Sequence, residues 1–212
     1  MHCYPRKSPA AVLFICATLL SLVAGCAGLM KPPPYDVSVD GISGPGGVGG
    51  TSYQLIARDA MAPRDPLLHE RVVTCVKAAF ADKGMFEAPA GTQPDIFITI
   101  DYGLGNTIPA MNGPPAVEKF LYMSARKERE DPRAGTRGEE LWNVRTSFAI
   151  PGVAIDAPMP LLAIVAGDYI GRDTISEQTV KIPRDSPALA RILATLTTGL
   201  KETEAKAKPP TP

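Results

Sequence analysis

The chain has 212 residues, and its 22 Lys and Arg balance 22 Asp and Glu, so the formal net charge is zero. A near-neutral chain offers no basic footprint for nucleic acid, and we expect no nucleic-acid partner. The length suits one domain with a substantial core. Only two histidines are present, which disfavours metal sites of the multi-histidine type and histidine-based catalysis.

Residues 1–25 have the pattern of a secretory signal. A basic pair at residues 6–7 precedes an uncharged apolar run from 10 to 24, and small residues follow before Cys26. This run is shorter than the roughly 20 apolar residues that a membrane span needs. The five residues that end at Cys26 resemble the bacterial lipobox, which implies cleavage between Gly25 and Cys26 and lipidation of the cysteine. An ordinary secretory signal with an incidental cysteine is the alternative.

A lipidated Cys26 implies a permanent membrane resident. Mature bacterial lipoproteins carry three acyl chains, and two or more chains give stable anchoring. Ala27 stands where an Asp is the usual inner-membrane retention signal of Gram-negative lipoproteins, so we expect a periplasm-facing lipoprotein of the outer membrane. Residues 26–34 are interpreted as an acylated tether that Pro32–Pro34 stiffen, which keeps the domain close to the bilayer.

The segment 35–200 is predicted to form one domain. Alternating apolar and polar residues predict strands at 35–42, 52–58, 95–102, 117–127, 141–150 and 174–182. Apolar residues at helical spacing predict helices at 66–83, 160–170 and 187–200. These elements predict an α+β fold: a single small domain with a mainly antiparallel sheet and two or three helices packed on it. The helices 66–83 and 187–200 are expected to cover the sheet, the helix 160–170 to be buried or membrane-facing, and residues 201–212 to be a disordered tail.

Two segments rich in glycine and proline separate these elements. Residues 44–49 match G-x-G-x-x-G, but a predicted strand follows instead of the helix that a nucleotide site requires. We therefore interpret them as a flexible hairpin loop and expect no nucleotide. Residues 103–115 are predicted to form a long irregular loop. It contains the apolar residues Leu104, Ile108 and Met111, which predict either contact with a partner, such as another envelope protein, or a lid over the domain's own core.

The residues that could carry chemistry are few and scattered. His69 is expected on an exposed helix face, and Cys75, in an apolar helix, is expected to be a buried, inert thiol. Asp95 and Asp101 flank one predicted strand about 20 Å apart, too far for a carboxylate pair. Asp168 is expected at a helix end or on the surface. We therefore expect no enzyme activity, no cofactor and no metal; a membrane-tethered hydrolase that uses these carboxylates is the alternative.

Three further segments carry a resemblance to a known family. They are the strand with Tyr53-Gln54-Leu55 and its following helix from Asp65-Pro66 to Lys83-Gly84, the run from Pro94 to Ile100, and Glu140-Leu141-Trp142. With the lipobox, they resemble bacterial envelope lipoproteins catalogued as domain of unknown function 4136. The resemblance implies a small α+β domain of unassigned function and transfers no functional residue. We expect a membrane-anchored, non-enzymatic binding, scaffold or transport-accessory module of the cell envelope.

Overall fold

The computed structural model describes residues 32–57, 65–109, 113–129, 138–152 and 154–207, with side chains up to residue 198. Its strands are β1 (Tyr35–Ser43), β2 (Ser52–Ala57), β3 (Phe86–Glu87), β4 (Ile96–Ile108), β5 (Ala116–Arg126), β6 (Glu140–Ile150) and β7 (Gln178–Ile182). Its helices are α2 (Pro66–Ala81), α3 (Met159–Asp168) and α4 (Pro187–Ala207). Helix α4 therefore continues beyond the expected end of the domain at residue 200.

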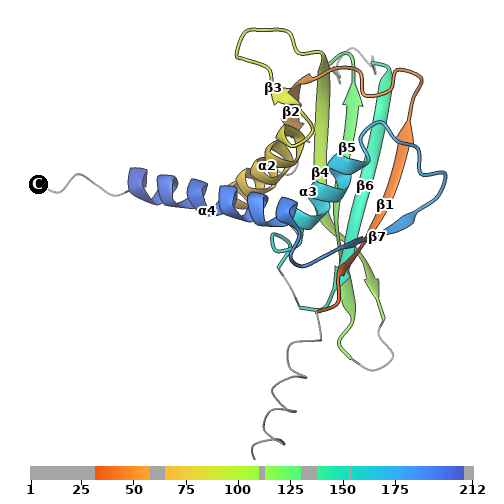
Figure 1. Cartoon of the computed structure of the whole chain (residues 1–212), viewed down its shortest axis with the longest axis vertical. Helices are drawn as coiled ribbons and strands as arrows, with labels where there is room; N and C mark the ends of the chain where they lie inside the picture. The colour runs from red at the N-terminus through yellow and green to blue at the C-terminus, as the bar shows by residue number, and fades with distance from the viewer. Residues whose placement is uncertain (1–31, 58–64, 110–112, 130–137, 153, 208–212) are drawn as a thin grey trace, which may run out of the picture. The chain divides into compact units, whose positions relative to one another are not determined.

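The seven strands form one sheet in the order β3-β2-β4-β5-β6-β1-β7. Strand β2 runs parallel to β3 and β4, while the other neighbouring pairs are antiparallel. The three helices lie on one side of this sheet (Figure 1). This architecture confirms the predicted α+β domain with a mainly antiparallel sheet.

The helix that lies over the centre of the sheet is α3, which contacts β1, β5 and β6. Helix α4 packs instead on α2 and α3, so the expectation that the helix from 187 covers the sheet was wrong. Because α3 has the sheet on one side and two helices on the other, its residues from Met159 to Gly167 are all buried. The apolar character of this helix on all sides thus reflects burial within the domain.

No helix in the described part of the chain is both long enough and apolar enough to cross a bilayer.

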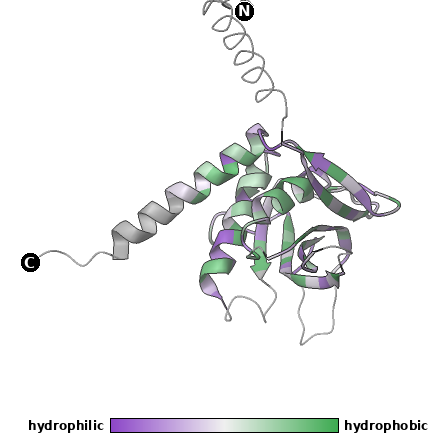
Figure 2. Cartoon of the chain, turned by 90° about the horizontal axis from the view of Figure 1, so that it is seen from below, coloured by the Kyte–Doolittle hydropathy of each residue, from purple (hydrophilic) through white to green (hydrophobic). Residues whose placement is uncertain are grey.

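Buried hydrophobic side chains of the helices and the sheet form one core cluster, and Figure 2 shows hydrophobic segments on both the helices and the strands. Helix α2 begins with the side chain of Asp65 accepting a hydrogen bond from the Leu68 N–H at 3.0 Å, and Pro66 occupies a first-turn position where no donor is needed. Near its other end Phe80, fully buried, meets the ring of Tyr53 edge to face with centroids 5.0 Å apart. The ring contact packs α2 on β2.

The glycine-rich segment 44–49 does not form the expected hairpin loop. Strand β1 lies beside β6 and β2 lies beside β4, so this segment carries the chain across the end of the sheet. Its backbone is held there, because the Gly44 N–H donates to the Leu141 carbonyl at 2.7 Å and the Trp142 indole N–H donates to the Val48 carbonyl at 3.2 Å. Gly44, Gly46 and Gly49 allow this close packing, and the hairpin interpretation was wrong. A strand, β2, follows the segment, as predicted.

Candidate functional site

The expected loop 103–115 is mostly a β-hairpin. Strand β4 continues to Ile108 and pairs with β5 as far as Ile108↔Ala116, with an irregularity between Leu104 and Thr107. The prediction of an irregular segment was therefore wrong for 103–108, where backbone pairing with β5 overrides the local glycines. Met111 lies outside the described residues, as do Gly25 and Cys26.

Two of the predicted contact residues are exposed on this hairpin. Leu104 is 62% exposed and Ile108 is 48% exposed. The core ends just before them: Tyr102 is buried, and the ring of His69, in the first turns of α2, stacks on it with centroids 6.1 Å apart. Leu104 lies two residues further along β4, beyond the part of the strand that contacts α2. Neither Leu104 nor Ile108 belongs to the core, so neither acts as a lid over it.

The histidine and the cysteine both have packing roles. His69 is half-buried, and its Nδ1 lies 3.2 Å from the hydroxyl of Tyr102, so the expectation of a solvated surface histidine was wrong. Cys75 is buried, and that burial raises the pKa of its thiol to about 12. A thiol with such a pKa is protonated at neutral pH and is not a nucleophile, which agrees with the inert thiol expected from the sequence.

The carboxylates considered for hydrolysis lie at separate places. Asp168 ends α3, where it forms an ion pair with Lys83 on the surface. Asp95 precedes β4, and Asp101 lies half-buried within that strand. The carboxylate of Asp95 accepts hydrogen bonds from the N–H groups of Thr51 and Ser52 at 3.1 and 2.9 Å. Asp95 therefore fixes the start of β2 against the start of β4.

These hydrogen bonds predict an effect of pH on stability. The Ser52 N–H, the Ser52 hydroxyl and the Thr51 N–H together lower the pKa of Asp95. A lowered folded-state pKa contributes stability above the unfolded-state value near about pH 4, and this contribution is lost as the pH falls through the folded-state pKa. We expect Asp95→Asn to lose less stability than the parent between about pH 6 and pH 3. Urea titrations at both pH values measure this, and equal losses would contradict it.

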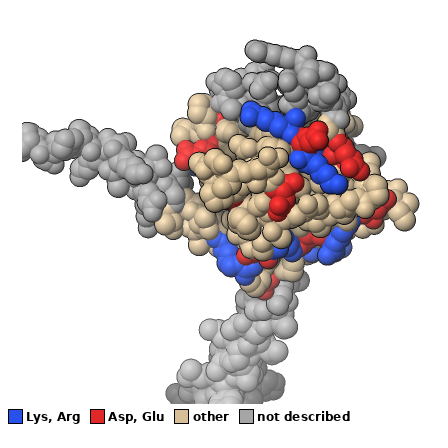
Figure 3. All heavy atoms as spheres, turned by 90° about the horizontal axis from the view of Figure 1, so that it is seen from above, with Lys and Arg blue, Asp and Glu red and all other residues tan. Residues whose placement is uncertain are grey.

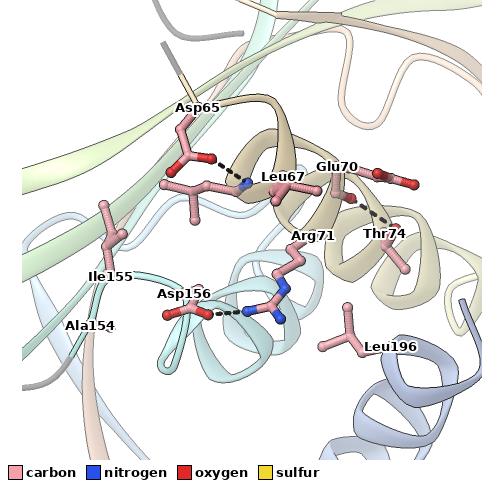
Figure 4. Close-up of a pocket in the computed structure, with 10 residues that line it drawn as sticks. Asp65, Leu67, Glu70, Arg71, Thr74, Ala154, Ile155, Asp156 and Leu196 are labelled. Carbon is pink, nitrogen blue, oxygen red and sulfur yellow. Dashed lines mark hydrogen bonds and ion pairs between the residues drawn. The ribbon is translucent and has the colours of Figure 1, made fainter. Parts of the chain in front are cut away.

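A cavity of about 430 Å³ lies at the N-terminal end of α2. Its wall combines the ion pair of Arg71 and Asp156 with apolar side chains from α2, α4 and the segment before α3, namely Leu67, Leu68, Leu196 and Ile155 (Figure 4). Residues 58–64 and residue 153, which lie outside the described residues, directly precede the lining residues Asp65 and Ala154 in the chain. The described lining therefore does not indicate which class of ligand the cavity could bind. No sequence motif could have brought these residues together, because they come from segments far apart in the chain.

A second hollow, of about 320 Å³, lies on strands β1, β4, β5 and β6. Glu118, which lines it, accepts hydrogen bonds from Arg145 at 3.0 Å and from the Asn106 N–H at 3.1 Å. The guanidinium of Arg145 lies 4.5 Å from the centre of the Phe120 ring. Burial would raise the pKa of Glu118, but the hydrogen bonds from the Asn106 N–H, Arg145 and Ser147, together with the positive charge of Arg145, outweigh it and lower that pKa. Glu118 is therefore a paired structural anion and not a proton donor at neutral pH.

The surface charges are mixed. Figure 3 shows basic and acidic side chains next to one another on the face that it presents. Ion pairs such as Arg126–Glu140 and Arg191–Asp82, both 2.6 Å, join neighbouring elements. Among the described residues, no group of three His, Cys, Asp or Glu side chains is placed to hold a metal ion.

Comparisons with known proteins give no family assignment. No family model matches the chain, and no curated protein matches it. Among solved structures, it is similar to a PDZ domain protein from Parabacteroides distasonis, with 12% identity, a TM-score of 0.46 and coverage of 81% of this chain. The chain spans 49% of that protein's length.

Two smaller solved proteins are also similar to the chain. The PelC dodecamer from Paraburkholderia phytofirmans has 9% identity, with 65% of this chain and 99% of that chain covered at a TM-score of 0.37. A minor lipoprotein from Acinetobacter baumannii has 11% identity, with 57% and 90% covered at a TM-score of 0.32. At these identities and scores, the likenesses transfer neither a function nor a site to this chain.

Proposed function

We propose that this protein is a lipoprotein of the bacterial outer membrane that acts by binding, as a scaffold or transport accessory, and not by catalysis. The observation that carries the proposal is the sequence of basic pair, apolar run and small residues that ends at Cys26. Strand β1 begins at Tyr35, shortly after that cysteine. The acylated N-terminus and the folded domain are therefore close neighbours along the chain.

The structural roles of the polar residues support a binding function without catalysis. His69 packs on Tyr102, Asp95 accepts backbone hydrogen bonds, and Asp168 pairs with Lys83. A hydrolase that uses a carboxylate pair needs two acids that converge on one substrate position. Asp95 holds the start of a strand and Asp168 ends a helix, which favours the binding role over the tethered hydrolase.

Replacing the cysteine tests the proposal directly. Parent protein, recovered from bacterial membranes, is expected to begin at Cys26 and to carry acyl chains in its intact mass. The variant Cys26→Ser is expected to keep its fold and to lose its membrane attachment, because the anchor is covalent lipid. Sucrose-gradient fractionation measures the location, with Cys75→Ser as the matched cysteine control that keeps the anchor. An unmodified Cys26, or a variant that remains in the outer membrane, would sink the proposal.

A further inference from the structure

Ile175 lies in the loop that joins α3 to β7 (Figure 1) and has an unusual backbone conformation. Among the residues that the structure describes, it is the only non-glycine residue with a positive φ, +61°. A β-branched residue rarely adopts such an angle, because its Cβ crowds the backbone. Glycine or asparagine would adopt the same conformation with less strain. The loop therefore holds Ile175 in a conformation that opposes the stability of the fold.

The side chain of Ile175 does not offset this strain by packing. It is 97% exposed, more than any other large hydrophobic side chain in the described part of the chain, where Leu67 follows with 69%. A single exposed apolar residue is ordinary on a protein surface, but here the exposed residue is also the strained one. Backbone strain of this kind is concentrated at sites of recognition and catalysis.

Hydrogen bonds on both sides of Ile175 hold the loop in place. Thr174 is buried, its N–H donates to the Gly41 carbonyl at 3.0 Å, and its hydroxyl accepts from the Gly41 N–H at 3.1 Å. The carboxylate of Asp173 accepts the N–H of Ile175 itself at 2.9 Å. The side-chain amide of Gln178 donates to the Thr174 carbonyl at 3.2 Å. The backbone that presents Ile175 is therefore ordered before any partner binds.

The two segments that this loop contacts carry exposed apolar side chains as well. Ile42, which is exposed, directly follows Gly41 on β1. Val48 is also exposed, and a Cβ on Gly171 would lie 2.9 Å from its Cγ2 atom. Ile175 therefore stands next to a surface that is itself partly apolar.

The charged residues around Ile175 are mostly acidic. Asp173 and Glu177 stand two residues before and two residues after it, and both are exposed. Asp40 lies beside the loop, where its carboxylate accepts a hydrogen bond from the hydroxyl at position 174. These three carboxylates outnumber the loop's basic residue, Arg172. An excess of negative charge is repelled by anionic lipid headgroups and attracted by a basic protein surface.

We propose, on the basis of the binding role proposed above, that Ile175 is the anchor of a protein–protein contact. Its partner is an envelope protein with an apolar socket that basic side chains border. An anchor whose conformation is fixed beforehand gains affinity from a partner of matching shape. A fluid lipid surface has no such shape, so the strained conformation together with the acidic surroundings selects a protein and not the bilayer.

A second copy of this chain does not provide that socket. Its apolar cavity at the N-terminal end of α2 is lined by three acidic residues, Asp65, Glu70 and Asp156, and by one basic residue, Arg71. The acidic surroundings of Ile175 would therefore meet a lining of the same sign, and like charges that face one another across an interface are unfavourable.

Two substitutions at position 175 test whether the residue serves the fold. Ile175→Asn is expected to raise the Tm by about 2–4 °C, because asparagine tolerates a positive φ. Ile175→Val keeps a β-branched side chain and is expected to leave the Tm unchanged. A lower Tm for Ile175→Asn would show that the side chain stabilises the domain, and would overturn its role as an anchor held for a partner.

Photocrosslinking in the bacterium that makes the protein tests the contact. A benzophenone amino acid is placed at position 175 of the full chain and, as a control, at the exposed position 104. Irradiation is expected to join position 175, and not position 104, to one other protein. The crosslinked peptide of that protein is expected to lie in an apolar recess with Lys or Arg at its border.

Charge reversal tests the chemistry of the partner. Glu177→Lys is expected to reduce the adduct at position 175 by about tenfold, because it places a positive charge against the basic border of the socket. Glu70→Lys, at an exposed position on α2, is the matched control and is expected to leave the adduct unchanged. An adduct that both substitutions leave unchanged would overturn the basic border.

The contact and the lipid anchor fail in different ways. Protein in the outer membrane that gives no adduct at position 175, an adduct with a second copy of itself or an adduct with lipid overturns the protein contact and keeps the anchor. An adduct with another protein, formed by a chain that carries no lipid, overturns the anchor and keeps the contact. Crosslinking at position 104 instead of 175 would assign the contact to the β4–β5 hairpin.

Discussion

Phe80→Ala is expected to lower the free energy of unfolding by about 3–5 kcal/mol, the cost of removing a buried aromatic side chain and leaving its cavity. Phe80 is fully buried on α2 and contacts Tyr53 edge to face. The neighbouring helix α3 is buried between the sheet and the other helices. The surroundings therefore cannot collapse far into the space that the ring leaves.

Urea titration of the two proteins measures this loss. Leu67→Ala is the matched control, because Leu67 lies on the same helix but is 69% exposed, and we expect it to change stability by no more than about 0.5 kcal/mol. A loss below about 1 kcal/mol for Phe80→Ala would mean that α2 is not fixed to the sheet by this side chain.

Gly49→Ala is expected to destabilise the domain by about 2–5 kcal/mol. Gly49 has a φ of +80°, where a side chain costs about 1–2 kcal/mol, and a Cβ there would lie 2.3 Å from Cδ1 of Leu141. Leu141 is 1% exposed and has no room to rotate away, so the overlap adds about 1–3 kcal/mol. Thermal and urea unfolding both measure the effect.

Gly47→Ala separates packing from backbone strain in the same segment. Gly47 also has a positive φ, +57°, but a Cβ at this position would meet no atom within 4 Å. We therefore expect only the backbone cost of about 1–2 kcal/mol. Equal effects of the two substitutions would show that the segment 44–49 is loose and not packed on Leu141.

Local sequence patterns were sufficient for most elements of this fold. The Asp65–Pro66 start of α2 and the alternation in β1, β5 and β6 depend on neighbouring residues, and the structure has these elements within a few residues of the predicted bounds. The end of β4 was missed because its pairing with β5 outweighs the glycines at 103 and 105. The place of the segment 44–49 was missed because strand order depends on distant partners, which local alternation does not encode.

The candidate site was predictable only in part. The apolar residues Leu104 and Ile108 stood out in the sequence because a segment rich in glycine and proline has little reason to hold them. Their position at the same end as Tyr35 follows from the register of three strand pairs and has no sequence signature. The Glu118–Arg145 pair likewise joins two strands through their register. The positions of these residues therefore depend on the pairing between strands and not on a local sequence motif.

The position of β1 in the sheet also constrains the order in which the protein folds. Strand β1 emerges first from any machinery that exports the chain from its N-terminus, yet its two neighbours are β6 and β7, which end at Ile150 and Ile182. Closing contacts between residues so distant in sequence is slow compared with local pairing. In a chain that emerges from its N-terminus, the hairpins β4–β5 and β5–β6 can form as soon as their strands appear, whereas β1 stays unpaired until β6 has emerged.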